Sequence, residues 1–140
     1  MNGIKEDIRD LIPQRAPMIM IDAFYGATES DADTGLTVSG DNLFCDGGRF
    51  TEPGLIEHIA QSASAFAGYN ARAKNEPAPL GMIGEVKKFR INFLPAVGDE
   101  LRTHIHILSE ILGVSLLAAE TIVNGEIAAR CNMKIFIKPA

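Results

Sequence analysis

A long helix carrying many small residues is the feature that most limits how this chain can fold. In residues 51–74, TEPGLIEHIAQSASAFAGYNARAK, Thr51 suits an N-cap, and Glu52 and Pro53 suit the first helical turn. Positions at intervals of three and four define one face: Leu55, Ile59, Ser62, Phe66 and Tyr69. Most of the flanking residues are alanine, serine or glycine, so we expect other elements to pack closely around this helix.

Apolar and alternating runs predict strands before and after the helix. The runs cover residues 17–28, 33–40, 80–95, 101–108, 113–123 and 126–138. The Asn-Gly pair at 124–125 is a strong hairpin signal between the last two. In the final strand, every second residue from Ile127 to Ile137 is predicted on one face, and Ala128 on the other.

The remaining segments predict a short helix and a loop. Residues 4–12 have apolar residues at helical spacing, and Pro13 ends that helix. Residues 40–54 are rich in turn formers and are predicted as a loop anchored by two phenylalanines. One long helix against one antiparallel sheet belongs to the α+β class. A length of 140 residues fits a single domain, residues 1–140.

Charge and targeting signals exclude several partners. The formal net charge of -5 argues against sequence-independent phosphate binding and against an anionic membrane surface. The N-terminus lacks the apolar core of a signal peptide, and no apolar run is long enough to span a bilayer. We therefore expect a cytoplasmic protein with no nucleic-acid or membrane partner.

Cysteine and histidine spacing predicts neither a metal site nor a cofactor. Cys45 and Cys131 are far apart in sequence, which fits free thiols in a reducing compartment. His104 and His106 share one face of a predicted strand, but no third ligand accompanies them. These two histidines are assigned to a solvated face.

Three segments in order along the chain resemble one family. LIPQRAPMIMID, residues 11–22, is similar to its leucine-proline-histidine-arginine stretch, which leads into an apolar strand and an aspartate. GLIEHIAQSASAFAGY, residues 54–69, resembles its helix with a glutamate and an Ala-Gln pair. KKFRINFLPAVGDELRTHI, residues 87–105, resembles its strand, turn and strand with Pro-x-x-Gly-Asp.

The family is that of the hotdog-fold β-hydroxyacyl-acyl-carrier-protein dehydratases of fatty-acid synthesis. More narrowly, the chain resembles the dehydratase-like proteins of aryl polyene and flexirubin-type pigment clusters. The resemblance implies a curved antiparallel sheet wrapped around a long central helix. It also implies an acyl thioester, carried on acyl carrier protein or coenzyme A, as the ligand.

The resemblance implies roles for three residues. Glu57 falls on the acidic position of the helix, Gln61 on the family glutamine, and Gln14 on the histidine of the first motif. The family's loop before the helix also carries a His-Phe-Pro-Gly stretch, whereas FCDGGRFTEPG is shorter and has no histidine. A glutamine cannot exchange a proton near neutral pH, so Gln14 either orients the acyl group or has a structural role in a turn.

The chemistry of dehydration suggests further candidates. Backbone N–H groups at the start of the helix, around Gly54, would polarise a thioester carbonyl. Arg15 belongs to a set of basic residues that suits the phosphate of a pantetheine arm. His58, next to Glu57, is a candidate substitute for the missing catalytic histidine, or else a partly buried structural residue. Glu57 is either functional or paired with a basic side chain.

Three functions remain open from the sequence. The chain is a dehydratase with a rearranged acid-base pair, a non-catalytic acyl-binding partner of an active homologue, or a hotdog thioesterase. Because exposed sheet edges need protection, we expect a homodimer or a heterodimer with a homologous dehydratase. Each site is expected to combine Gln14 of one chain with Glu57 of the other.

Overall fold

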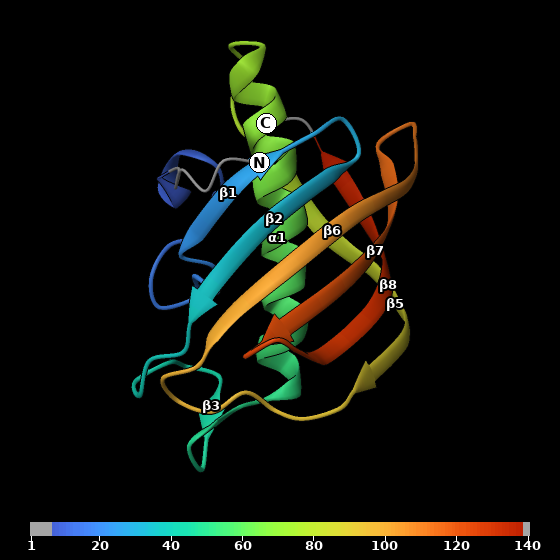
Figure 1. Ribbon diagram of the computed structural model, residues 1–140. Coiled ribbons are helices and arrows are strands. Elements are labelled where there is room, and N and C mark those ends of the chain that lie inside the picture. The colour runs from blue at the N-terminus through green and yellow to red at the C-terminus, as the bar shows by residue number, and fades with distance from the viewer. Residues whose placement is uncertain (1–6, 139–140) are drawn as a thin grey trace.

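A long helix, α1 (Glu52–Ala73), lies against a six-stranded antiparallel sheet in the computed structural model, which describes residues 7–138. The strands of the sheet are β1 (Ala23–Ala27), β2 (Asp31–Thr37), β5 (Leu80–Ile91), β6 (Glu100–Ile111), β7 (Val114–Val123) and β8 (Glu126–Lys138). Their order is β1-β2-β6-β7-β8-β5, and they cross α1 obliquely (Figure 1). The predicted α+β class and hotdog architecture are confirmed.

The small residues of α1 allow close packing, as the sequence predicted. Gly68 is the tightest point, because a Cβ added there would overlap the backbone carbonyl of Leu11. Thr51 takes the N-cap position with extended backbone, at φ -83° and ψ 169°. Its hydroxyl donates to the carbonyl of Phe44 at 2.7 Å rather than capping the helix. The helix therefore begins where predicted, but the threonine secures the preceding loop.

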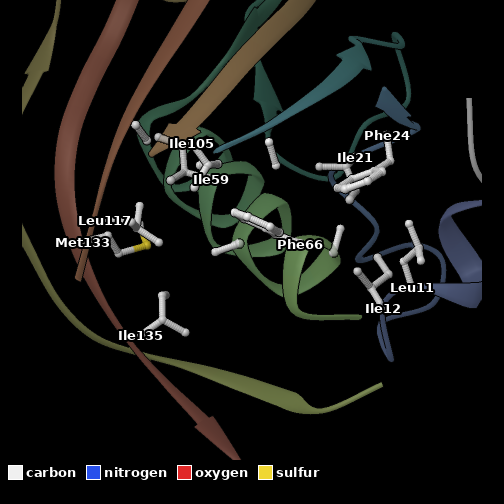
Figure 2. Close-up of a cluster of buried hydrophobic side chains, with 14 of the residues drawn as sticks. Leu11, Ile12, Ile21, Phe24, Ile59, Phe66, Ile105, Leu117, Met133 and Ile135 are labelled. Atoms are coloured by element: carbon white, nitrogen blue, oxygen red, sulfur yellow. The ribbon is translucent and has the colours of Figure 1, made fainter. Parts of the chain in front are cut away.

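Two clusters of buried side chains fill the space between α1 and the sheet. The larger one joins the segment before β1, the middle of α1 and the inner face of β6, β7 and β8. Figure 2 labels ten of its residues: Leu11, Ile12, Ile21, Phe24, Ile59, Phe66, Ile105, Leu117, Met133 and Ile135. The smaller cluster packs near the start of α1, around Phe50 and Leu55. Within residues 7–138, no helix is both long and apolar enough to cross a membrane.

The first strand begins later than predicted. The apolar run from residue 17 was expected to be strand throughout, but β1 starts at Ala23. The backbone groups of Met18 and Met20 bond to the side chains of Gln61 and His58 on α1. These backbone groups are thus satisfied by the helix instead of by a neighbouring strand.

Two shorter segments also differ from the prediction. The expected N-terminal helix begins in residues 4–6, which lie outside the described residues, and its described part forms the 3-10 turn η1 (Ile8–Asp10). The predicted loop at 40–54 contains a small hairpin of β3 (Cys45–Asp46) and β4 (Arg49–Phe50). Gly47 and Gly48 both have positive φ, at 58° and 79°, which a turn of this kind requires.

The alternation predicted for the last strand fails near its start. Ala128 and Ala129 are both fully buried, because the register of β7 against β8 shifts between Thr121 and Ile122. The carbonyl of Ala128 accepts from the backbone N–H of Asn92 at 2.7 Å. A bulge of this kind brings two consecutive residues inward, which a strict period of two cannot indicate.

Candidate functional site

Gln61 fastens the segment before β1 to the central helix. Its side chain is fully buried, and its Nε2 donates to the carbonyl of Met18 at 2.7 Å and to Glu57 Oε1 at 2.9 Å. Its Oε1 accepts from the backbone N–H of Met20 at 2.7 Å. We call this set of three bonds the Gln61 clamp. It holds the Glu57 carboxylate towards Gln61, one turn further along α1, as the i, i+4 spacing predicted.

Glu57 and Gln14 of the same chain line one cavity of about 280 Å³, which we call the Glu57 cavity. Ala60 and Ser64 of α1 continue the helical wall of this cavity. The other wall consists of Gly81, Met82 and Ile83 from β5 and Ile135 from β8. One chain therefore brings Gln14 and Glu57 to the same cavity. The pairing of Gln14 from one chain with Glu57 of the other stays a prediction.

Two buried polar atoms on residues that line this cavity have no hydrogen-bond partner within residues 7–138. They are the buried Gln14 Oε1 and the buried Ser64 Oγ. Sequence reasoning singled out Gln14 but missed Ser64. Ser64 follows Glu57 by seven residues, two helical turns, so the signal was a small polar residue on the glutamate face of the helix.

His58 is placed in the core and not in the cavity. Its side chain is fully buried, with Nδ1 2.7 Å from the carbonyl of Met20 and Nε2 2.7 Å from Thr103 Oγ1. Burial lowers the pKa of His58 to about 4. The neutral ring therefore donates from Nδ1 to Met20 and accepts from Thr103, which in turn lies 2.7 Å from Thr121 Oγ1. His58 connects helix and sheet and is not among the residues that line the cavity.

Gly54 and Arg15 also lie away from the cavity lining. A Cβ added to Gly54 would come within 2.6 Å of the Phe50 ring and 2.7 Å of Phe44 Cβ, so this glycine permits close packing under the loop. Arg15 donates to the backbone carbonyls of Ile12 at 2.8 Å and of Gln14 at 2.7 Å. The arginine thus supports the backbone of the segment that carries Gln14.

A second, larger cavity of about 750 Å³ lies along the C-terminal half of α1. Its apolar wall includes Phe66 and Ala67 of the helix and Leu117 of β7. Lys74 and Glu76 also line it, beyond the end of α1. Ile135 of β8 lines both cavities, so the two lie next to each other at this residue.

The remaining histidines form a hydrogen-bonded cluster with two aspartates. His104 lies 2.8 Å from both Asp33 Oδ1 and Asp31 Oδ1, and His106 lies 2.9 Å from Asp31 Oδ1. Burial alone lowers the pKa of His104, but the hydrogen bonds to Asp33 and Asp31 raise it overall. The Ser30 hydroxyl, followed by His106 and His104, lowers the pKa of Asp31 to about 2. No group of side chains within residues 7–138 has the arrangement of a metal site.

This cluster predicts a defined pH dependence. The folded pKa of His104 lies above its ordinary 6.5, so its contribution to stability is present below that value and lost as the pH rises through the folded pKa. The contribution of Asp31 is present above about pH 4 and lost as the pH falls towards its folded pKa. The cluster is therefore strongest between roughly pH 4 and 6.5. An NMR titration of the His104 ring should have its midpoint above pH 6.5. Asp33→Asn should lower this midpoint, because the ring loses a charged hydrogen-bond partner. An unchanged midpoint in that variant would contradict the role assigned to Asp33.

A long helix wrapped by an antiparallel sheet is the hotdog fold, and Glu57 and Gln61 lie one turn apart on it, as the resemblance to the dehydratases implied. The family model described as ApeP dehydratase matches residues 6–140. The chain therefore belongs to the ApeP-like dehydratase family. Its similarity to a curated dehydratase supports the same class: it is 26% identical, over 139 residues, to the 3-hydroxyacyl-[acyl-carrier-protein] dehydratase FabZ of Syntrophotalea carbinolica. That alignment covers 95% of this chain and 93% of the relative.

Solved structures share the fold. A chain of the dehydratase heterocomplex ApeI:P from Xenorhabdus doucetiae superposes with a TM-score of 0.90 at 18% identity, covering 98% of this chain and 93% of that one. A hypothetical thioesterase protein with coenzyme A from Streptococcus pneumoniae TIGR4 superposes with a TM-score of 0.65 at 8% identity, covering 83% and 84%. At these identities the likeness concerns the fold.

Proposed function

We propose that this chain takes part in the dehydration of a β-hydroxyacyl thioester as a subunit that supplies Glu57 but no histidine. The observation that carries the proposal is the lining of the Glu57 cavity. Glu57, Gln14 and Ser64 are its polar residues, and no histidine within residues 7–138 lines it. A cavity of this composition binds and orients a substrate but has a single side chain able to move a proton near neutral pH.

The elimination itself requires two proton transfers. The Cα–H and Cβ–O bonds break, the Cα–Cβ double bond forms, and the hydroxyl leaves as water. One group takes the Cα proton and another supplies a proton to the leaving oxygen. Glu57 is suited to one of these steps. Gln14 is a neutral amide and His58 is enclosed in the core, so the second group has to come from elsewhere.

A homologous dehydratase is the partner that we propose. The cavity lies beside β5, which forms one end of the sheet. The β5 side chains Leu80, Met82 and Ile83 are 44%, 57% and 40% exposed, an apolar edge that a second hotdog chain would cover. The solved relative named ApeI:P is itself a heterocomplex of dehydratases. By analogy we propose a heterodimer with a histidine-bearing homologue, acting in fatty-acid or aryl polyene biosynthesis.

The carrier of the acyl group is proposed on the same basis. The FabZ relative acts, by its name, on 3-hydroxyacyl groups attached to acyl carrier protein. We propose the same carrier here, with coenzyme A as the alternative.

A hotdog thioesterase is the second candidate function, because a helix carboxylate with a water molecule needs no histidine. The match to a dehydratase family over residues 6–140 favours the first function.

The test compares the isolated chain with two preparations that supply the missing histidine: a mixture with a histidine-bearing homologous dehydratase, and the Gln14→His variant. We expect the isolated chain to release no measurable enoyl product from a β-hydroxyacyl thioester on acyl carrier protein. Addition of a histidine-bearing homologous dehydratase should give a mixed dimer, seen by size-exclusion chromatography, that turns over faster than either chain. Gln14→His should raise the turnover of the isolated chain at least about 10-fold, since a positioned base contributes about 10²–10⁴-fold.

Gln14→Asn is the matched control. It keeps an amide, so the isolated variant should release no measurable enoyl product. Rapid dehydration by the unmodified isolated chain would contradict the proposal. Release of free thiol from the thioester, without enoyl product, would instead support the thioesterase function.

A further inference from the structure

The two unpartnered polar atoms of the Glu57 cavity point to a specific ligand group. Ser64 is only 2% exposed, and its Oγ and Gln14 Oε1 are both buried without a partner in the described part of the chain. Buried polar atoms in folded proteins are almost always hydrogen-bonded, because losing water without compensation costs free energy. Two such atoms on residues that line one cavity point to a polar group, of a ligand or of water, that completes them.

The course of the chain agrees with the placement of Gln14 and Ser64 at one cavity. The segment before β1 runs antiparallel to the helix: Leu11 meets Gly68, and Met18 bonds to Gln61. Gln14 lies between these two contacts in the chain and therefore beside the stretch of helix that contains Ser64. The Gln61 clamp draws the Glu57 carboxylate towards the same stretch.

The chemistry of the lining limits what can bind. Gln14 Oε1 can only accept a hydrogen bond, whereas the Ser64 hydroxyl can donate or accept one. Apart from Glu57, the other lining residues are uncharged and apolar: Ala60, Gly81, Met82, Ile83 and Ile135. The group that fits is neutral, donates to Gln14 and accepts from Ser64. A hydroxyl does both, and in a substrate it would take the place of a water molecule bound there.

We propose that Ser64 and Gln14 together bind the β-hydroxyl of the acyl substrate, next to the Glu57 carboxylate. This inference rests on the proposed function, since it names the part of the substrate that the same cavity recognises. In this arrangement Ser64 is a specificity-determining residue that distinguishes a hydroxyacyl thioester from a saturated one. It moves no proton in the reaction.

Calorimetric titration with two soluble pantetheine thioesters tests the inference. One carries a β-hydroxybutyryl group and the other a butyryl group, so they differ by the hydroxyl alone. The unmodified chain, in its dimeric form, should prefer the hydroxyacyl ligand by about 5- to 160-fold, the range that corresponds to two ordinary hydrogen bonds. Ser64→Ala should reduce this preference by about 2- to 12-fold, because one of the two bonds is lost. Gln14→Leu should also reduce it.

Ser62→Ala is the matched control on the same helix. The Ser62 hydroxyl is already bonded, to the His58 carbonyl at 2.8 Å and to Thr34 Oγ1 at 2.7 Å. Its loss should lower the melting temperature but leave the ligand preference unchanged. Ser64→Ala should instead raise the melting temperature by about 3 °C, because it removes an unpartnered buried hydroxyl.

The outcomes separate the inference from the proposed function. If the unmodified chain binds both thioesters equally, or if Ser64→Ala keeps the preference, the hydroxyl subsite is wrong even where dehydration is observed. If Ser64→Ala loses the preference while no assembly of the chain dehydrates its substrate, the subsite stands and the proposed function falls.

Discussion

Gly68→Ala is expected to lower the free energy of unfolding by about 3 kcal/mol or more. The added Cβ would occupy the position of the Leu11 backbone carbonyl, which no rotamer change can move aside. The surrounding segment is held on α1 by the Gln61 clamp, so neither partner can shift without breaking buried hydrogen bonds. The expected sign is opposite to the usual one, since alanine in a helix interior is normally about 1 kcal/mol better than glycine.

Urea denaturation followed by circular dichroism measures this effect. Ala67→Gly is the matched control at the neighbouring position, where the change should cost only about 1 kcal/mol of helix propensity. If Gly68→Ala were as stable as the unmodified chain, the close approach of Leu11 to α1 would be wrong.

Glu57→Gln is expected to reduce dehydration by the mixed dimer by about 10²–10⁴-fold. The glutamine has nearly the same shape and its carbonyl can still accept from Gln61 Nε2, so the cavity should keep its form. What is lost is the ability to exchange a proton and the negative charge beside the substrate. Initial rates of enoyl formation from a carrier-bound β-hydroxyacyl group measure the change.

Glu52→Gln is the matched control, because Glu52 is an exposed residue in the first turn of the same helix and does not line the cavity. It should retain the rate of the unmodified dimer. A Glu57→Gln dimer that works within twofold of that rate would show that the partner chain performs the chemistry at a different site.

The fold was largely predictable because its signals are local. The small residues of α1, the alternation of β6 and the Asn-Gly turn between β7 and β8 each act over a few neighbouring positions. Together they indicate a helix surrounded by an antiparallel sheet. The place of Glu57 on the helix, and its bond to Gln61 one turn later, followed from helical periodicity.

The remaining features depend on contacts between distant residues. The start of β1 at Ala23 reflects side chains of α1 that bond the preceding backbone, and no local pattern encodes this. The inward turn of Ala128 results from a register shift between strands. Ser64 could not be predicted as a site residue, because its place beside Gln14 at the cavity depends on how distant segments pack. The lack of a partner for its hydroxyl in the described part of the chain depends on the same packing.

Two of the three bonds of the Gln61 clamp run to backbone groups, so they do not depend on which side chain stands at position 14. Gln14 takes part in none of these bonds, and only the third one, from Gln61 to Glu57, involves a side chain proposed to transfer a proton. A gene copy of such a chain can therefore lose a reactive side chain by a single base change and still produce a stable, well-shaped subunit. Selection can then retain that copy as the partner subunit of an active homologue. Restoring a reactive side chain by design would need few further substitutions.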